Sequence, residues 1–219
     1  GQANFGYRDP VLGILARRGD AKAQEWLLEQ LARRGAHDDD QEDPAVELID
    51  DPAFRHRVLA IARAQCLPGR AGGRALAILA DRNVIEARPL FLLGALKESV
   101  PCLRAMFRLK DPEAFGLAIK LLGSGGVYAR LGAIRALEEW GGRPAVPYLV
   151  SRLDDMEEAW DAQIERGEDR MPNAPNPRIA VAAMAALEKL TGVKSEGTSH
   201  AERRVSWKDW HAKNRDAWK

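Results

Sequence analysis

Apolar residues recur every three or four positions along most of the chain, which is the spacing that places them on one face of an α-helix. Two stretches show it most clearly: Val127, Leu131, Ile134 and Leu137, then Ile179, Ala183, Leu187 and Leu190. No sustained stretch alternates apolar with polar residues and is rich in β-branched or aromatic side chains, as a strand would require. The pattern therefore predicts an all-α protein.

Helix starts are marked by an Asp or Asn that can cap free backbone N–H groups, followed by proline at the first helical position. These pairs are Asp9-Pro10, Asp43-Pro44, Asp51-Pro52, Asp111-Pro112 and Asn176-Pro177, with Asp20 and Ser206 as further caps and Asp209 as the capping-box partner of Ser206. Caps and apolar spacing together predict about twelve helices. We expect them at 10–18, 21–34, 44–50, 53–66, 72–81, 84–97, 99–109, 112–123, 127–140, 144–166, 177–191 and 206–217.

Internal similarity groups these helices into pairs. Residues 133–138 match residues 183–188, and each of the two helices ends in a glycine, Gly142 or Gly192. A recurring helical pair is the unit of a solenoid. We therefore predict one continuous α-solenoid of about six antiparallel helix pairs, irregular over 1–110 and clearer over 111–219.

The predicted helix from residue 144 to 166 is longer than its counterparts. Its apolar stripe continues through Met156, Trp160 and Ile164 before a loop begins. This overhang either packs on a neighbouring helix or offers an apolar docking surface to a partner. In the second interpretation Trp160 is the candidate anchor.

Two segments in the second half of the chain follow one another as a helical pair. Residues 128–137 read Tyr-Ala-Arg-Leu-Gly-Ala-Ile-Arg-Ala-Leu, and residues 143–149 read Arg-Pro-Ala-Val-Pro-Tyr-Leu. Together they resemble one bacterial HEAT repeat, a unit of an armadillo-type family. The ending, a Leu-Thr-Gly turn at 190–192 followed by a Trp-rich helix, is similar to the closing repeat of such proteins. The resemblance implies a curved stack whose second helices line a concave, protein-holding surface. The spacing of Trp207, Trp210 and Trp218 on the closing helix suits a lid over the last apolar layer, and the alternative is that they stack on bases or a ligand.

Charge is balanced overall, with 33 Lys and Arg against 32 Asp and Glu, so no global field draws the chain to nucleic acid. Locally, arginines gather in 55–88 and acids in 138–170. If the second helix of each pair lines the concave surface, this surface is predicted to carry a basic stripe. Such a stripe would suit an acidic protein segment or a phosphate backbone. Its residues are Arg55, Arg63, Arg88, Lys97 and Lys120. The alternative is scattered, solvated side chains whose stems cover apolar surface.

The sequence contains no phosphate-binding loop, paired-histidine zinc motif or nucleophile elbow, so we expect no catalytic, cofactor-binding or metal-binding residues. Two cysteines inside apolar patterns, Cys66 and Cys102, are expected to be buried and reduced. No apolar run is long enough to span a bilayer, and residues 1–10 do not resemble a leader. We expect a cytoplasmic protein without a membrane partner.

The expected function is a non-catalytic scaffold that binds another protein through its concave face or the 156–166 overhang. One alternative is nucleic-acid binding of the kind seen in HEAT-like DNA glycosylases, although Glu157, Glu158 and Glu165 around Trp160 and Asp161 would repel phosphate. Another is an enzyme-accessory role, lyase-like or immunity-type. A lyase-like role predicts an apolar pocket with a perturbed acid or histidine.

Overall fold

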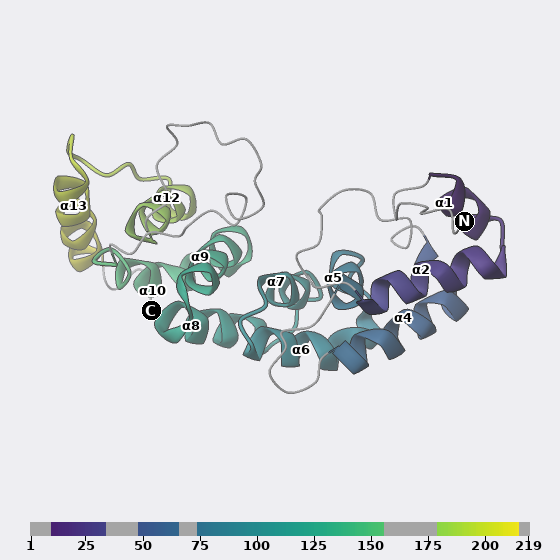
Figure 1. Cartoon of the computed structure of the whole chain (residues 1–219). Coiled ribbons are helices and arrows are strands. Elements are labelled where there is room, and N and C mark those ends of the chain that lie inside the picture. The colour runs from purple at the N-terminus through teal and green to yellow at the C-terminus, as the bar shows by residue number, and fades with distance from the viewer. Residues whose placement is uncertain (1–9, 34–47, 66–73, 156–178, 215–219) are drawn as a thin grey trace. The chain divides into compact units, whose positions relative to one another are not determined.

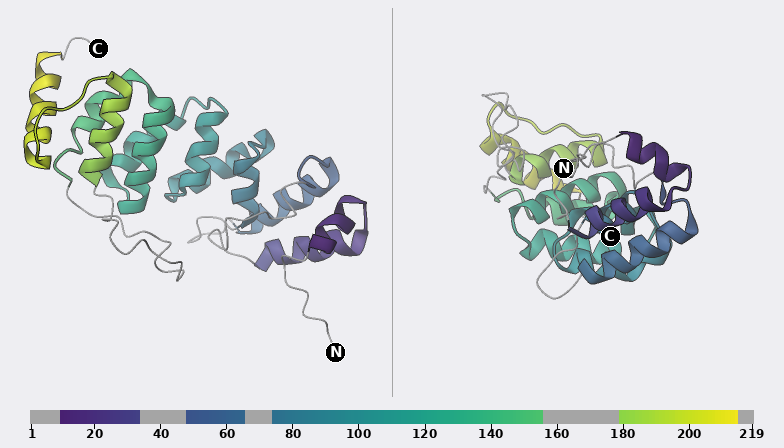
Figure 2. Two further views of the ribbon diagram at one scale, coloured as in Figure 1. Left: turned by 90° about the horizontal axis from the view of Figure 1, so that it is seen from above. Right: turned by 45° about the vertical axis from the view of Figure 1, so that its right-hand side comes forward.

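The computed structural model describes residues 10–33, 48–65, 74–155 and 179–214, and every regular element among them is helical (Figures 1 and 2). The predicted all-α class is therefore confirmed for this part of the chain. The chain divides into two compact units, Gly1–Asp111 and Pro112–Lys219. Each unit has its own buried core.

The first unit is built from antiparallel neighbours that share a core. Its elements are α1 (Pro10–Arg17), α2 (Ala21–Arg33), α4 (Pro52–Gln65), α5 (Arg74–Asp81), the 3-10 turn η1 (Ile85–Ala87), α6 (Arg88–Leu96) and α7 (Val100–Arg108). Helix α4 packs on α2 and α5, and α7 packs on both α5 and α6. Phe54 and Phe91 fill the core with Leu103. Helices α6 and α7 approach closely because Gly94 faces Cys102.

The second unit ends in the helix that carries the candidate site. Its elements are α8 (Ala114–Ser124), α9 (Val127–Ala136), the π-helical turn η2 (Leu137–Gly141), the 3-10 turn η3 (Arg143–Ala145), α10 (Val146–Val150), α12 (Ile179–Thr191) and α13 (His200–Lys213). Helix α9 packs on α8 and α12. Helix α13 packs on α10 and α12 and is drawn in yellow in Figure 1.

Four helices of the first unit end in a left-handed residue, and only one of these is glycine. The residues are Gly19, Asn83, Glu98 and Lys110, with φ of 85°, 52°, 68° and 54°. After each, the next amide N–H donates back to a carbonyl five residues earlier, as from Ser99 to Gly94 and from Asp111 to Met106. This pattern satisfies carbonyls that a helix end leaves without partners.

In both units, carbonyl groups near the ends of helices also accept hydrogen bonds from long side chains later in the chain. Gln65 Nε2 lies 2.7 Å from the Leu31 carbonyl oxygen at the end of α2. Arg108 Nη1 lies 3.5 Å from the Ala80 oxygen in α5. Arg152 Nη1 lies 3.4 Å from the Leu122 oxygen in α8. In each case the C-terminal ends of two helices are joined.

Two predicted caps and two predicted stops are confirmed. The Asp20 carboxylate accepts from the Ala23 N–H at 2.8 Å, and the Asp51 carboxylate accepts from the Ala53 N–H at 2.9 Å. Gly142 and Gly192 have φ of 61° and 72°. Asp9, Asp43 and Asn176 lie outside the described residues, as do Cys66 and residues 44–47 of the predicted helix at 44–50.

Two other predicted caps are wrong. Asp111 is not the N-cap residue of α8, because that helix begins only at Ala114, after Glu113, and the buried Asp111 carboxylate is bound by Arg88. The last helix begins at His200 rather than Ser206, and its capping box is formed by Ser199 and Glu202. Ser206 lies inside the helix, where its hydroxyl accepts from a backbone N–H.

The predicted continuous helix from 144 to 166 is also wrong, because α10 ends at Val150. Residues 151–154 form turns in which the Ser151 hydroxyl donates to the Tyr148 carbonyl at 2.6 Å. Asp155 then turns toward the start of α12, where its carbonyl accepts from the Ala180 N–H at 2.8 Å. Residues 156–178, and with them Met156, Trp160 and Ile164, lie outside the described chain.

Candidate functional site

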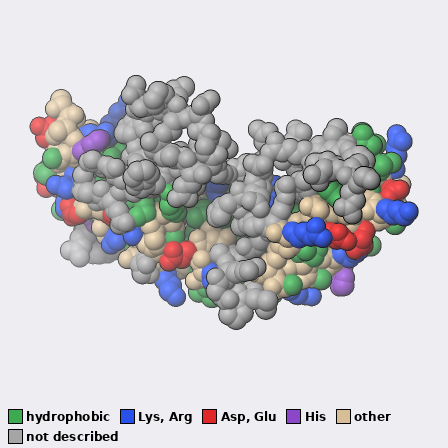
Figure 3. Space-filling view, viewed as in Figure 1, with side chains coloured by type: hydrophobic (Ala, Val, Ile, Leu, Met, Phe, Trp, Pro, Cys, Tyr) green, Lys and Arg blue, Asp and Glu red, His purple; other side chains and the backbone are tan. Residues whose placement is uncertain are grey.

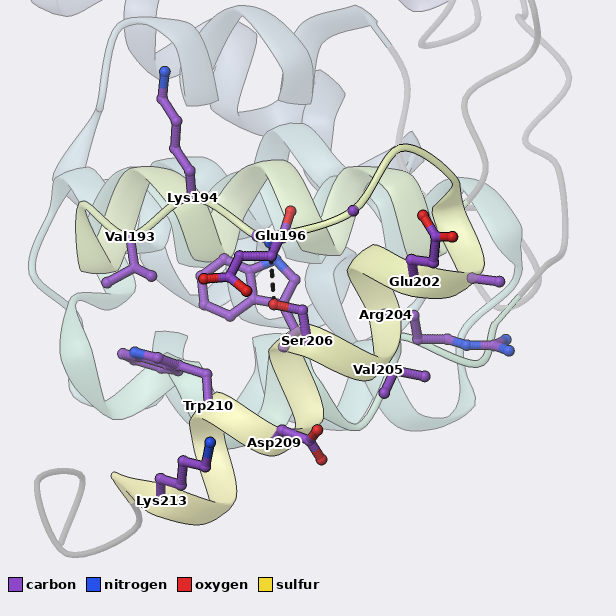
Figure 4. A pocket seen from close by; sticks show the side chains of 14 residues that line it. Val193, Lys194, Glu196, Glu202, Arg204, Val205, Ser206, Asp209, Trp210 and Lys213 are labelled. Carbon is purple, nitrogen blue, oxygen red and sulfur yellow. Dashed lines mark hydrogen bonds between the residues drawn. The ribbon is translucent and has the colours of Figure 1, made fainter.

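A groove of about 690 Å³ opens between the extended segment 193–197 and helix α13 (Figure 4). The segment follows the end of α12, and a turn at residues 198–199 leads into α13. Both walls therefore come from one continuous stretch of chain. We call this site the C-terminal groove.

Trp207 and Trp210 supply the aromatic surface of the groove. The helical period places Trp207 inward, where it is only 1% exposed, whereas Val205 points outward and is 55% exposed. The two indole rings meet edge to face, with centroids 5.3 Å apart and planes at 86°. Within the described chain, the buried Trp207 Nε1–H has no hydrogen-bond partner. The burial of Trp207 is consistent with the predicted lid, which stays a prediction; Trp218 lies beyond the described residues.

Side chains hold the extended wall in place without a partner strand. The Val193 N–H donates to the Thr191 hydroxyl at 3.1 Å, and the Glu196 N–H donates to the Ser206 hydroxyl at 3.1 Å. The second bond joins the wall directly to α13 (Figure 4). At the end of the wall Gly197 has φ of 118°, and a Cβ there would lie 2.5 Å from the Glu202 Cβ. Only glycine fits this turn.

Ion pairs anchor α13 to the rest of its unit. Arg203 lies 2.6 Å from Glu188 on α12, and Lys208 lies 2.6 Å from Asp154 in the turn after α10. The hydrogen bond from Lys208 lowers the pKa of Asp154. Burial acts to raise the pKa of Glu188, but hydrogen bonds from Arg203 and Ser195 outweigh burial and lower this pKa.

The capping box fixes the start of the same helix. The Glu202 carboxylate accepts from the backbone N–H groups of Ser199 and Thr198, at 3.1 and 2.8 Å, and these bonds lower the pKa of Glu202. The Glu202 N–H in turn donates to the Ser199 hydroxyl at 3.2 Å. The pKa values of Asp154, Glu188 and Glu202 are thus all lowered by hydrogen bonds that also hold α13 in position.

The rim of the groove carries four charges that pair with nothing in the described chain, two acidic and two basic. They belong to Lys194, Glu196, Asp209 and Lys213. A rim of mixed, solvated charge around an aromatic centre resembles the polar border of a protein–protein interface. It does not resemble a phosphate-binding surface, which is dominated by Lys and Arg.

The residues of the predicted basic stripe fall in both units. Arg55 lies 3.6 Å from Glu86, and Arg88 Nε lies 2.5 Å from the buried Asp111 carboxylate. Arg63 is exposed near the end of α4, Lys97 is half-buried directly after α6, and Lys120 is exposed on α8 in the second unit. Arg55 and Arg88 therefore take part in ion pairs within the first unit, and the stripe itself stays a prediction.

The described residues contain neither a metal-ligand cluster nor a membrane-spanning helix. Among them, no three His, Cys, Asp or Glu side chains gather closely enough to hold a metal ion. No helix of the described chain has both the length and the apolar character needed to cross a bilayer. Cys102 is buried and forms no disulfide with another described residue, as the sequence predicted.

Sequence analysis did not identify the groove, because it assigned no structure to the segment between the helices predicted at 177–191 and 206–217. Two local signals could have found it: the Gly197 turn, and the Ser199 to Glu202 spacing of a capping box. Comparison of the sequence with protein-family models gives no match, and comparisons with curated proteins and with solved structures give none either.

Proposed function

We propose that this protein is a non-catalytic interaction module that binds another protein, and that the C-terminal groove is its binding surface. The observation that carries the proposal is the groove itself, in which Trp210 and the exposed Val205 lie beside a fixed wall and inside a rim of unpaired charges. Aromatic side chains surrounded by a polar border are the usual energetic centres of protein interfaces.

The rigidity of the groove favours binding. The wall is tied to α13 by the Glu196 to Ser206 bond, and α13 is tied to its unit by Arg203 and Lys208. A partner would therefore meet a site that loses little conformational entropy on binding. Affinity in such a site comes from a few buried anchors rather than from its total area.

The finer architecture forms part of this proposal. We infer a HEAT-like solenoid of about six helix pairs, working in a bacterial cytoplasm. Within each unit, the packing of helices on near neighbours in sequence supports it, since each repeat of a solenoid contacts only the repeats beside it. The 156–166 stripe and the basic residues Arg55, Arg63, Arg88 and Lys120 remain candidate secondary contacts.

A capture experiment tests the proposal. The tagged protein, Val205→Glu and Ile85→Glu would each be incubated with nuclease-treated lysate of the cells that produce it, and retained proteins identified by mass spectrometry. Ile85 is a matched control because it is an apolar side chain of similar exposure, 59%, on the first unit. We expect a protein retained by wild type and Ile85→Glu and lost by Val205→Glu.

Two results would count against this function. A retained protein that binds Val205→Glu equally well would move the interface away from the groove. Recovery of nucleic acid from untreated lysate, weakened by salt and by charge reversal of Arg55, Arg63 and Arg88, would favour the nucleic-acid alternative instead.

A further inference from the structure

A second cavity, smaller than the C-terminal groove, lies where the start of α13 meets α12. Its volume is about 100 Å³, and its apolar lining includes Leu153, which follows α10, with Val181 and Met184 of α12. We call it the α12–α13 pocket. An apolar cavity of roughly 150 Å³ holds a benzene ring. The smaller α12–α13 pocket therefore suits one branched aliphatic side chain rather than an aromatic one.

Both polar side chains among the described residues that line this pocket are basic. They are His200 and Arg204, in the first two turns of α13. The Asp154 carboxylate lies 3.5 Å from Arg204 but 2.6 Å from Lys208, which neutralises it more directly. One acid and two cations therefore leave a net positive charge beside the pocket. Figure 3 shows a histidine side chain beside basic ones over α13, at the left of the view.

Arg204 has N–H groups to offer to an anion. Within the described chain, its side chain makes one polar interaction, the long ion pair with Asp154, and donates no hydrogen bond. Figure 4 shows this side chain pointing away from Trp210. A guanidinium presents its N–H groups as a fork that matches the two oxygens of a carboxylate. A carboxylate bound by Arg204 would therefore lie at the edge of the α12–α13 pocket.

We propose that the α12–α13 pocket binds the C-terminal residue of a polypeptide partner that ends in Leu or Val. The aliphatic side chain fills the pocket, and Arg204 binds the terminal carboxylate. The site goes beyond the proposed function, because its apolar lining from Leu153 and α12 is not part of the C-terminal groove. Ala201 and Arg204 line both cavities.

The combination of a small apolar cavity and an adjoining cation selects this occupant. The last residue of a polypeptide carries an aliphatic side chain and a negative charge on the same Cα, whereas an internal Leu or Val brings two uncharged peptide groups. Capture of a terminal carboxylate is a recurring way of binding peptides. One buried side chain and one charge-assisted contact give a weak complex, so we expect a Kd on the order of 100 μM.

Peptide titrations followed by fluorescence anisotropy test the ligand. The probe is an N-terminally labelled hexapeptide of Gly and Ser that ends in Leu with a free carboxylate, titrated with the full chain to about 1 mM, well above the expected Kd. The same peptide with an amidated C-terminus should bind about tenfold more weakly, because a charge-assisted hydrogen bond is lost. Peptides that end in Gly or Phe should also bind more weakly, since Gly leaves the pocket empty and Phe exceeds its size.

Substitutions in the chain test the site. Arg204→Gln should weaken binding of the free peptide about tenfold, as amidation does. Lys213→Gln is the matched control, because it removes the same charge from the same helix at a residue that lines the groove alone. Val181→Phe should fill the pocket and abolish binding, whereas Val205→Glu, in the groove, should leave it unchanged. Thermal unfolding of each variant verifies that its fold is intact.

The decisive comparison combines the two ways of removing one contact. In Arg204→Gln, amidation of the peptide should change the Kd by less than about twofold, because its carboxylate has already lost its partner. Absence of binding to wild type, or equal binding of the free and amidated peptides, overturns the inference. Binding lost on Val205→Glu but kept on Val181→Phe would place the peptide in the groove and overturn it as well. None of these results depends on whether the groove captures a protein.

Discussion

The guanidinium of Arg130 lies 3.0 Å from the carboxylate of Asp155 and joins the first turn of α9 to the segment that follows α10. The same guanidinium donates to the Gly125 carbonyl at 2.7 Å. The Asp155 carbonyl meanwhile accepts from the Ala180 N–H of α12. One ion pair, 14% and 17% exposed, thus holds three helices of the second unit together.

Replacing Arg130 by Gln should lower the free energy of unfolding by about 2 kcal/mol, because Asp155 would keep a largely buried charge without its partner. Urea unfolding followed by tryptophan fluorescence measures this. Arg135→Gln is the control, since Arg135 is exposed on the same helix and should change stability by less than about 0.5 kcal/mol. Equal effects of the two substitutions would contradict the assigned role of the pair.

Replacing Gly94 by Ala should destabilise the first unit by about 2 kcal/mol, because the new Cβ would meet Cys102 Sγ at 2.5 Å. Gly116→Ala is the matched control: a Cβ there meets nothing within 4 Å, so a gain of about 0.5–1 kcal/mol is expected from helix propensity. In Gly94→Ala/Cys102→Ala the loss should be smaller than the sum of the single losses. Additive losses would show that the sulfur is not the obstacle.

Replacing Lys110 by Gly should stabilise the first unit by about 0.5–1 kcal/mol, because Lys110 has φ of 54°, where a Cβ is strained. The same substitution at Lys120, inside α8, should instead cost about 1 kcal/mol. The two variants share their chemistry and differ only in backbone conformation. Thermal unfolding compares them, and a loss at both positions would mean that the strain at Lys110 is negligible.

Glu202 should make the second unit sensitive to acid. Hydrogen bonds from Ser199 and Thr198 lower its pKa below the ordinary 4.5. The ionised carboxylate therefore stabilises the fold above about pH 4.5, and this contribution is lost as pH falls through the lower pKa of the folded state. Glu202→Gln should have a lower Tm than wild type at pH 7, and the gap should narrow at pH 3.

The capping role of Glu202 would be contradicted if the two proteins differed by the same amount at both pH values. Glu196→Gln serves as the control. Glu196 is exposed, and its side chain makes no hydrogen bond in the described chain. This variant should follow wild type across the whole range.

Local patterns predicted the helical class and several boundaries, because those depend on neighbours in sequence. The apolar period required no tertiary information, and neither did the Asp20 and Asp51 caps or the glycine stops at 142 and 192. Each of these features is decided within one or two helical turns.

Other boundaries were missed because distant residues decide them. Ser199 and Ser206 both precede an acid by three positions, and only the burial of Trp207 requires the helix to continue through Ser206. The Asp111 carboxylate is bound by Arg88 from another helix, which no local rule detects. Glu98 and Lys110 end their helices in a conformation that their side chains disfavour, because packing fixes the chain that follows.

The groove could not be predicted for the same reason. It depends on the path of 193–197 along α13, which is set by bonds from Thr191 and Ser206 that join separate elements. Sequence reasoning predicted a Trp-rich last helix, and Trp207 on this helix is buried. It did not show that the segment before this helix runs beside it and leaves space between them.

Side chains from later in the chain donate to carbonyl groups at the ends of earlier helices. The point at which the chain is truncated therefore decides whether the remaining helices keep these hydrogen bonds. A fragment that stops before Arg108 would leave the Ala80 and Asp81 carbonyls without their donor, although both belong to a helix that the fragment retains whole. The same holds for Gln65 and α2, and for Arg152 and α8. A helix in this protein is complete only when the chain extends one packing partner beyond it, so useful truncation points lie after these three residues.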